Sequence, residues 1–412
     1  MKRVINILIL LFTVGGIFAQ EPEFPANTKP ASTNIVNADY PRLDADRKAY
    51  FHLRAPDAQS VSVSLGNVAL TKGDDGFWTG VTAPLDPGFH YYTLKIDGVD
   101  VADPGSETFF GASRVMSGIE VPEAGVDFYD IKDVPHGDVR SHWYLAKSTG
   151  EMRHAFIYTP PDYDENVNKR YPVLYLQHGM GEDRRAWPNQ GHANFILDNL
   201  IAAGKAKPMI IVMEDGGIAG GFGGARRQGP RPAAGQNQGQ RPAAGQGQRP
   251  GGGQGQRRGS GPGGMASFWD EFGSVIIKDL IPNIDANYRT LTDRENRAIA
   301  GLSLGGTQTY QISQANLDKF ANIGIFSAPF GFPGVETGYN GLLKKPDEFN
   351  KQVKVFFISM GSKEGANSGR GIHEELNKAG IKNVYYEAPG TAHEFQTWRK
   401  SLYGFAQLLF QK

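Results

Sequence analysis

The sequence predicts a doubly wound α/β sheet that is preceded by a small β-sandwich. Three observations predict this arrangement. Residues 26–120 carry short runs of alternating apolar and polar residues, separated by Pro, Gly and Asp, with no helical pattern between them. Residues 141–412 carry short runs that are apolar on both faces and alternate with amphipathic stretches, as a parallel sheet covered by helices requires. A linker at 121–140 separates the two patterns.

Composition supports two globular units and excludes several classes of protein. The chain has 412 residues, whereas single cores stop growing near ~250–300 residues. Its 43 Lys and Arg balance 43 Asp and Glu, which excludes a wholly basic nucleic-acid binder. A mean hydropathy of -0.40 excludes a polytopic membrane protein. The absence of Cys excludes a disulfide framework and a thiolate site.

The first 19 residues have the pattern of a signal peptide. Lys2 and Arg3 precede an apolar run from Val4 to Phe18, which is shorter than the ~20 residues needed to span a bilayer, and the small Ala19 follows. We expect cleavage after Ala19 and export to the periplasm or the outside. The alternative is a membrane anchor, but no later segment adds a span.

The β-sandwich is predicted from four runs with a period of two. Strands that recur every ~8–12 residues without helices are typical of such a fold. The runs are Ala49–Pro56, Ser60–Leu65, Gly76–Val81 and His90–Gly98. The stretch from Ala49 to Pro104 resembles the early-set, immunoglobulin-like domain that precedes many carbohydrate-active enzymes. Its aromatic residues can stack on sugar rings, but alternation favours core and inter-domain packing for Phe77, Trp78, Tyr91 and Tyr92.

The α/β sheet is predicted from seven mostly apolar runs separated by four amphipathic stretches. The predicted strands are His154–Thr159, Pro172–Gly179, Pro208–Asp215, Arg297–Ser303, Ile323–Ala328, Val353–Gly361 and Val384–Pro389. The predicted helices occupy 195–204, 272–285, 373–380 and 398–410.

An insert at 216–264 follows neither pattern. It contains no acidic residue, seven Arg and a repeated RPAAGQ that begins at Arg231 and Arg241. Such a composition buries too little apolar area to offset its ordering entropy, so we expect a disordered loop. The loop follows a strand, at the edge where open α/β sheets bind ligands. We interpret it as a tolerated loop expansion; the alternative is a weak contact with anionic polymers through its Arg residues.

A nucleophile is predicted at Ser303, in the sequence Gly301-Leu302-Ser303-Leu304-Gly305. A Ser on a tight turn between a strand and a helix needs small neighbours so that its Oγ projects above the sheet. The N-terminus of the following helix also favours a developing negative charge. The strand before Ser303 and the helix-like stretch after it make this motif specific.

The base and its partner are predicted from the end of the chain. A neutral Ser needs a base within hydrogen-bond reach, and only His373 and His393 follow Ser303. His373 lies within a helical stretch, whereas His393 lies in a loop after a strand and is predicted as the base. Glu364 is the first carboxylate after the predicted strand Val353–Gly361, and it is predicted to orient the imidazole. Less well placed carboxylates are Glu374, Glu375 and Glu387.

The oxyanion of the tetrahedral intermediate needs two backbone N–H donors. One is predicted at Leu304, directly after the nucleophile. The other is predicted at Met180, in the sequence His178-Gly179-Met180-Gly181, whose Gly residues let the backbone approach a substrate. We expect His178 to shape this loop; a simple Gly turn is the alternative.

These motifs together resemble the esterase D-like carbohydrate esterase family, an α/β-hydrolase family that holds feruloyl and acetylxylan esterases. The resemblance is carried by YPVLYLQHGMGED with Trp187, by NFILDNLIAAGKAKPMIIVMEDG, by the stretch around AIAGLSLGG and by YYEAPGTAHEF, and it covers nearly all of 141–412 except the insert. It implies a serine ester hydrolase with Ser303 as nucleophile, His393 as base, and oxyanion donors at Met180 and Leu304. Many relatives carry Asp where Glu364 stands.

The expected substrate is a feruloyl or acetyl ester of plant cell-wall polysaccharide, or a small aromatic ester, with feruloyl favoured. No metal, cofactor or nucleic-acid partner is implied. Candidates for gripping an acyl group or a sugar are Trp187, Trp269 and Trp398, although Trp is more often a core residue. The alternatives are a siderophore trilactone esterase and a carbohydrate-binding protein that kept the fold without turnover.

Overall fold

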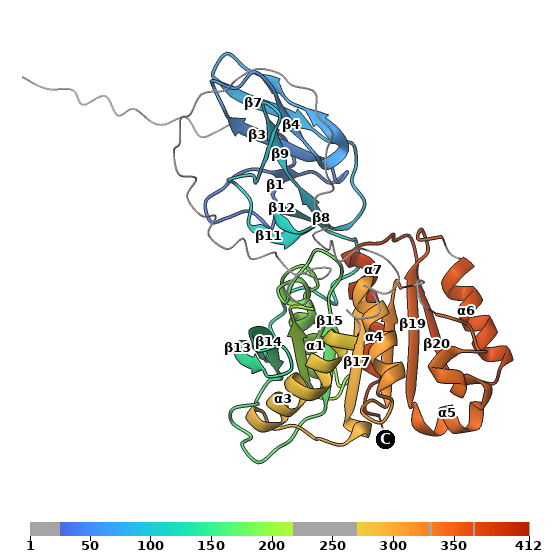
Figure 1. Cartoon of the computed structure of the whole chain (residues 1–412). Helices are drawn as coiled ribbons and strands as arrows, with labels where there is room; N and C mark the ends of the chain where they lie inside the picture. Colours follow the sequence, from blue (N-terminus) through green and yellow to red (C-terminus); the bar gives the residue numbers. More distant parts are fainter. Residues whose placement is uncertain (1–24, 217–269, 329–331, 366, 412) are drawn as a thin grey trace, which may run out of the picture.

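The computed structural model describes residues 25–216, 270–328, 332–365 and 367–411 (Figure 1). The predicted signal peptide, nearly all of the Arg-rich insert and Trp269 lie outside these residues. Within the described part of the chain, no helix is both long enough and apolar enough to cross a membrane.

The N-terminal β region (residues 25–121) consists of short antiparallel strands. One sheet has the order β1 (Lys29–Pro30), β2 (Arg42–Leu43), β3 (Ala49–Arg54), β7 (Phe77–Val81) and β6 (Thr71–Lys72). A second has the order β10 (Val99–Val101), β9 (Leu94–Ile96), β4 (Val61–Val63) and β5 (Val68–Ala69). A third has the order β11 (Thr108–Gly111), β12 (Arg114–Val121) and β8 (Gly88–Tyr92).

The predicted run His90–Gly98 is two strands rather than one. The chain leaves the third sheet after Tyr92 and enters the second at Leu94. Between them, the N–H of Thr93 donates to Ser64 Oγ at 2.8 Å, outside either ladder. Of the four aromatic residues for which alternation favours packing, Trp78 and Tyr92 are buried in the core of this region, whereas Phe77 and Tyr91 are half-buried.

The α/β region contains one sheet of eight strands. Its order is β13 (Asp138–Ala146), β14 (Glu151–Thr159), β16 (Ile210–Glu214), β15 (Val173–Gln177), β17 (Arg297–Leu302), β18 (Asn322–Phe326), β19 (Val355–Gly361) and β20 (Val384–Ala388). The pairs β13–β14 and β14–β16 are antiparallel, and the pairs from β16 to β20 are parallel. The predicted sheet is therefore present, with all seven predicted strands.

Strand β13 is an addition to that prediction. It begins in the expected linker, at Asp138, and its solvent-facing residues alternate with half-buried ones because it is an edge strand. The criterion of apolar faces on both sides, which found the central strands, does not detect such a strand.

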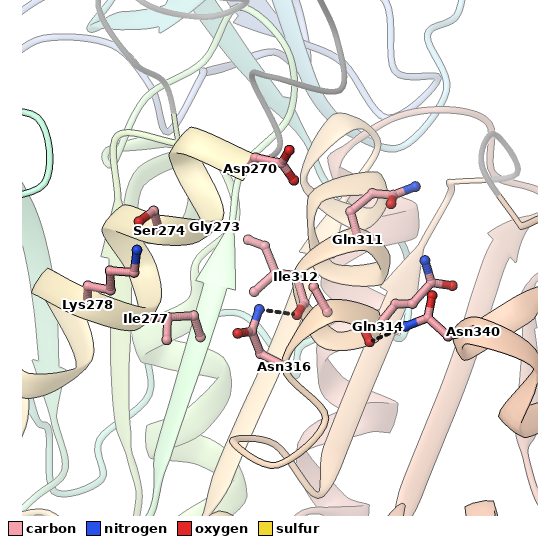
Figure 2. A pocket seen from close by; sticks show the side chains of 11 residues that line it. Asp270, Gly273, Ser274, Ile277, Lys278, Gln311, Ile312, Gln314, Asn316 and Asn340 are labelled. Carbon is pink, nitrogen blue, oxygen red and sulfur yellow. Dashed lines mark hydrogen bonds between the residues drawn. The ribbon is translucent and has the colours of Figure 1, made fainter. Parts of the chain in front are cut away.

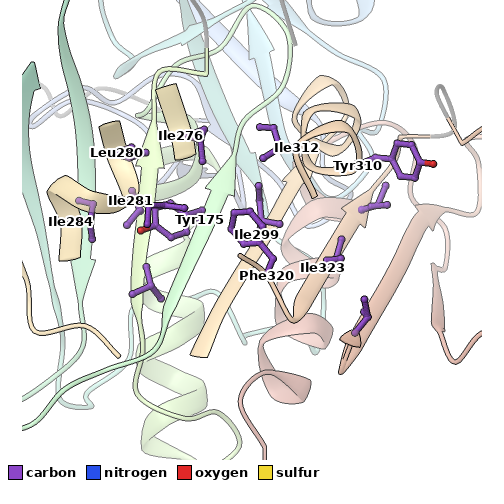
Figure 3. Packing of buried hydrophobic residues seen from close by; sticks show 14 of the residues in the cluster. Tyr175, Ile276, Leu280, Ile281, Ile284, Ile299, Tyr310, Ile312, Phe320 and Ile323 are labelled. Atoms are coloured by element: carbon purple, nitrogen blue, oxygen red, sulfur yellow. The ribbon is translucent and has the colours of Figure 1, made fainter. Parts of the chain in front are cut away.

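Helices cover both faces of the sheet. On one face, α1 (Ala193–Ala202) and α7 (Phe395–Leu408) share a core with apolar side chains of the sheet. On the other face lie α3 (Ile281–Asn287), α4 (Leu304–Ala315), α5 (Pro346–Gln352) and α6 (Asn367–Lys378). Figure 3 shows this second core, which contains Ile299 and Ile323 of the strands as well as Ile276 and Leu280 of the helical segment before α3.

The β region packs directly against the α/β region. Phe89 and Phe109 belong to the same buried cluster as Phe395 of α7, and the rings of Phe89 and Phe395 meet edge to face at 5.9 Å. The guanidinium of Arg399, also on α7, is fully buried and forms two parallel hydrogen bonds with the carboxylate of Glu120, at 2.7 and 2.8 Å. The first residues of α7 thus lie at the junction of the two regions (Figure 1).

Candidate active site

Four loops meet at the carboxyl edge of the parallel strands. They follow β15, β17, β19 and β20. The first is called the β15 loop (residues 178–182), and the other three carry Ser303, Glu364 and His393 in that order. Parallel strands end at a common edge, so residues far apart in the sequence come together there. The insert also starts from this edge, after β16.

Ser303 occupies a sharp turn between β17 and α4. Its backbone has φ 52° and ψ −118°, a conformation that is costly for a residue with a side chain and that places Oγ above the sheet. A Cβ at Gly301 would lie 2.4 Å from the carbonyl of Gly305, and a Cβ at Gly305 would lie 2.4 Å from the carbonyl oxygen of His178. Only glycine fits at both positions, because the turn presses against the β15 loop.

Ser303, His393 and Glu364 form one chain of hydrogen bonds. Ser303 Oγ lies 2.9 Å from His393 Nε2, and His393 Nδ1 lies 2.7 Å from Glu364 Oε2. With its proton on Nδ1, the imidazole donates to the carboxylate and accepts from the hydroxyl. The Glu364 side chain is 4% exposed, whereas that of His393 is 49% exposed. The carboxylate is therefore shielded, while the imidazole can be reached by substrate and water.

Glu364 is held by two further donors. Its Oε1 accepts the hydroxyl of Ser327 at 2.7 Å and the backbone N–H of Gly361 at 2.6 Å. Ser327 follows β18 with a φ of 50° and accepts the indole N–H of Trp398 at 3.0 Å. Ser327 was not predicted from the sequence; its position just after a strand, at the edge where the other site residues lie, is the one signal that points to it.

The two predicted oxyanion donors lie beside the nucleophile. Leu304 is the first residue of α4, so its N–H has no partner inside the helix. In the β15 loop, a Cβ on Gly179 would lie 3.5 Å from the Cβ of Ser303. No hydrogen bond between described residues uses the N–H of Met180, and this residue is 62% exposed. The role of Met180 and Leu304 as oxyanion donors stays a prediction.

Glu182 is a buried carboxyl that the sequence did not indicate. Its Oε2 accepts the N–H of Gly179 at 2.9 Å, so it fixes the start of the β15 loop from the inside. Burial raises the pKa of this carboxyl to about 7, and the nearby His178 only partly opposes the effect. His178 itself is buried, with Nδ1 2.8 Å from the carbonyl of Gly179, and makes no hydrogen bond to Ser303. This placement fits a role in shaping the loop.

Comparison with known proteins identifies the family. The model of the Esterase family matches residues 146–243 and 237–408. The chain belongs to the Esterase family. An endo-1,4-beta-xylanase/feruloyl esterase of Xylanibacter ruminicola is 38% identical to it over 393 residues, which are 93% of this chain and 47% of that protein. The chain thus spans about half the length of this curated relative.

Solved structures confirm the fold of this Esterase family member. A CE1 ferulic acid esterase of Anaeromyces mucronatus, solved with ferulic acid, has a TM-score of 0.51 at 22% identity, covering 69% of this chain and 96% of its own. The enterobactin esterase of Shigella flexneri has a TM-score of 0.57 at 13% identity, covering 87% and 92%. The predicted α/β-hydrolase fold and carbohydrate esterase resemblance are confirmed, whereas the early-set assignment of the β region stays a prediction.

Two of the three tryptophans that were candidates for binding substrate, Trp187 and Trp398, lie in the described part of the chain, and both are buried. Trp187 is 1% exposed and donates its indole N–H to the carbonyl of Gln177 at 2.9 Å. Trp398 is buried, and its ring meets the imidazole of His393 edge to face at 5.2 Å. Neither indole has a free face for a sugar or an acyl group, so both are core residues, as Trp more often is, and the substrate-binding alternative does not hold for them. Trp398 instead supports Ser327 and His393.

One cavity of about 350 Å³ lies elsewhere, between the helical segment before α3 and the end of α4 (Figure 2). Ser274, Lys278, Gln311 and Asn316 are among its lining residues. Gln311 is two helical turns along α4 from Ser303, or roughly 12 Å at 1.5 Å per residue. Among the residues that the structure describes, none of those predicted for the active site lines this cavity.

Proposed function

We propose that the chain is a serine carboxylic ester hydrolase that removes feruloyl or acetyl groups from plant cell-wall polysaccharide. The observation that carries the proposal is the hydrogen-bonded chain from Ser303 through His393 to Glu364. A hydroxyl, an imidazole and a shielded carboxylate in this order are the parts that an acyl transfer to serine requires.

Acylation follows from these positions. Ser303 Oγ attacks the ester carbonyl while His393 Nε2, at 2.9 Å, takes its proton. Glu364 keeps the imidazole in the accepting tautomer and stabilises the imidazolium that forms. The carbonyl oxygen becomes an oxyanion between the N–H groups of Met180 and Leu304, each such donor being worth roughly 10²–10³ in rate. The intermediate then collapses as its bond to the sugar oxygen breaks, and His393 gives its proton to that oxygen, which leaves as a sugar hydroxyl.

Deacylation repeats the steps with water. The half-exposed edge of His393 lets a water molecule approach the acyl-enzyme, and Nε2 takes its proton as the oxygen attacks the acyl carbon. The second tetrahedral intermediate breaks at the bond to Ser303 Oγ, which recovers its proton from His393. The products are the free acid and the original enzyme, so the cycle needs no external reactant except water.

The substrate class is supported by the relatives. The 38% identical relative is named for both xylanase and feruloyl esterase activity, and its match covers 93% of this chain. This favours an ester carried on a xylan, with feruloyl preferred over acetyl as the acyl group.

The test compares methyl ferulate, acetylated xylan and a short aryl acetate at matched concentrations. We expect turnover that is abolished by Ser303→Ala, with methyl ferulate hydrolysed fastest. Activity confined to the acetyl esters would make the protein an acetylxylan esterase. No turnover on any of the three would overturn the proposed substrate class, and a siderophore trilactone would then be the next substrate to test. A variant Ser303→Ala that kept full activity would overturn the mechanism.

A further inference from the structure

The turn of the β11–β12 hairpin reaches the β15 loop. The backbone N–H of Ser113 donates to the carbonyl oxygen of Gly181 at 2.8 Å. Gly181 has a φ of 78°, and a Cβ there would lie 2.9 Å from Ser113 N and 3.1 Å from the Cα of Ala112. The two backbones are therefore in direct contact, at a point where only glycine fits.

The β15 loop is thereby fixed from two sides. From inside, Glu182 accepts the N–H of Gly179 at 2.9 Å. From outside, Ser113 donates to Gly181. Met180 lies between these two fixed residues, and its N–H is the proposed oxyanion donor. Such a donor must point at the place where charge develops, with an error of no more than ~0.5 Å, so both restraints bear on the rate.

The hairpin is itself held firmly against the α/β region. Gln190, which follows the β15 loop, donates from Nε2 to the hydroxyl of Tyr91 at 2.6 Å and to the carbonyl of Phe110 at 3.1 Å. Arg399 binds Glu120 of β12 through two hydrogen bonds and also donates to the carbonyl of Gln190 at 2.9 Å. These bonds are buried or part-buried, and they fix the hairpin against the α/β region. The turn at Ser113 therefore has a fixed position relative to the β15 loop.

We propose that the β11–β12 hairpin is a positioning element of the esterase site, in which the Ser113 N–H holds the carbonyl of Gly181 and so aims the N–H of Met180 at the oxyanion. The proposal rests on the proposed function. It requires that the β region contribute to kcat on every ester, including one too small to reach any polysaccharide-binding surface. A β region that only gathers polysaccharide would instead change KM for polymers alone.

The test uses the full chain and a short aryl acetate. Ser113→Pro removes the N–H and excludes the φ of 62° seen at this position, whereas Ser113→Gly keeps the N–H and tolerates that φ. The Ser113 side chain is exposed, so its loss in the glycine variant is not expected to matter. We expect kcat to fall at least tenfold in Ser113→Pro with KM within about threefold, and Ser113→Gly to stay within twofold of the original enzyme.

A second readout separates positioning from general damage. An aryl trifluoromethyl ketone adds to Ser303 and places its oxygen in the oxyanion site, so its affinity should fall in Ser113→Pro by about the same factor as kcat. If this variant does not fold, as judged by circular dichroism, Ser113 can be replaced with its α-hydroxy acid, which removes only the N–H donor. An unchanged kcat in a folded variant, or a lower kcat with unchanged ketone affinity, would overturn the proposal. Absence of turnover in the original enzyme would instead refute the proposed function.

Discussion

Replacing Glu364 with Gln tests the orientation of the imidazole, and the structure determines which way the new amide must face. Oε1 of Glu364 accepts two donors, the Ser327 hydroxyl and the Gly361 N–H, at 2.7 and 2.6 Å. The amide oxygen of Gln must take this position, because the amide nitrogen cannot accept hydrogen bonds. The nitrogen then faces His393 Nδ1, which lies 2.7 Å from Oε2 in the original enzyme. Two donors cannot face each other, so the imidazole must carry its proton on Nε2 instead.

That tautomer cannot take the proton of Ser303. We therefore expect kcat on an aryl acetate to fall by about 10³–10⁴, which corresponds to roughly 4–5.5 kcal/mol of transition-state stabilisation. Glu387→Gln is the matched control, because Glu387 pairs with Arg370 at the surface of the same region, and its kcat should stay within twofold. A kcat for Glu364→Gln above one tenth of the original value would refute the assignment of Glu364.

Three further changes give separate expectations. Ser327→Ala removes a donor from Glu364 and leaves the buried indole N–H of Trp398 without its acceptor. We therefore expect kcat to fall about tenfold. We also expect the free energy of unfolding, measured with denaturant, to fall by an amount on the order of 1–3 kcal/mol. Burial raises the pKa of Glu182 from 4.5 to about 7, so the native state keeps a proton that the unfolded chain releases in this window and stability falls as the pH rises through it. Glu182→Gln has no charge to bury, and its stability relative to the original chain should rise by about 3 kcal/mol between pH 4 and pH 8; a difference that stays constant with pH would contradict the burial argument. Arg399→Met leaves the Glu120 carboxylate without its buried partner and should lower the free energy of unfolding by about 3–5 kcal/mol, and an unchanged Tm would contradict this.

The central sheet was predictable because its strands are buried on both faces. Such strands have short, uniformly apolar sequences, and the seven predicted runs all appear in the sheet. The edge strand β13 was missed because only one of its faces is covered, so polar residues interrupt its pattern. In the β region, the break at Thr93 depends on which sheet each half of the run joins, and that choice is made by long-range pairing of β8 with β12 and of β9 with β4.

In the active site, too, some residues could be predicted from the local sequence, whereas others depend on contacts between residues far apart in the chain. Ser303 and His393 could be predicted because each has a local signature: Ser303 lies in a glycine-flanked turn, and His393 lies in a loop after the last strand. Ser327 and Glu182 have no such signature, because a Ser after a strand and a Glu after a Gly turn are common. Their significance comes from the groups that they meet in space, Glu364 and the N–H of Gly179. The substrate-binding alternative for Trp187 does not hold, because nearness in sequence to the β15 loop does not determine whether an indole is buried.

The contacts between the β region and the α/β region differ in how firmly they fix the position of the active-site residues. Lys363, next to Glu364, pairs with Asp86 of the β region at 3.1 Å, but both side chains are exposed, and such pairs contribute at most about 1 kcal/mol. The Arg399–Glu120 pair is buried and bidentate, so it fixes orientation as well as distance. It joins the strand that leads from the Ser113 turn to the helix that follows His393. A displacement of the β region would therefore disturb the oxyanion side of the site through the Ser113–Gly181 contact, and the Glu364 side through α7, whose Trp398 donates to the Ser327 that holds Glu364.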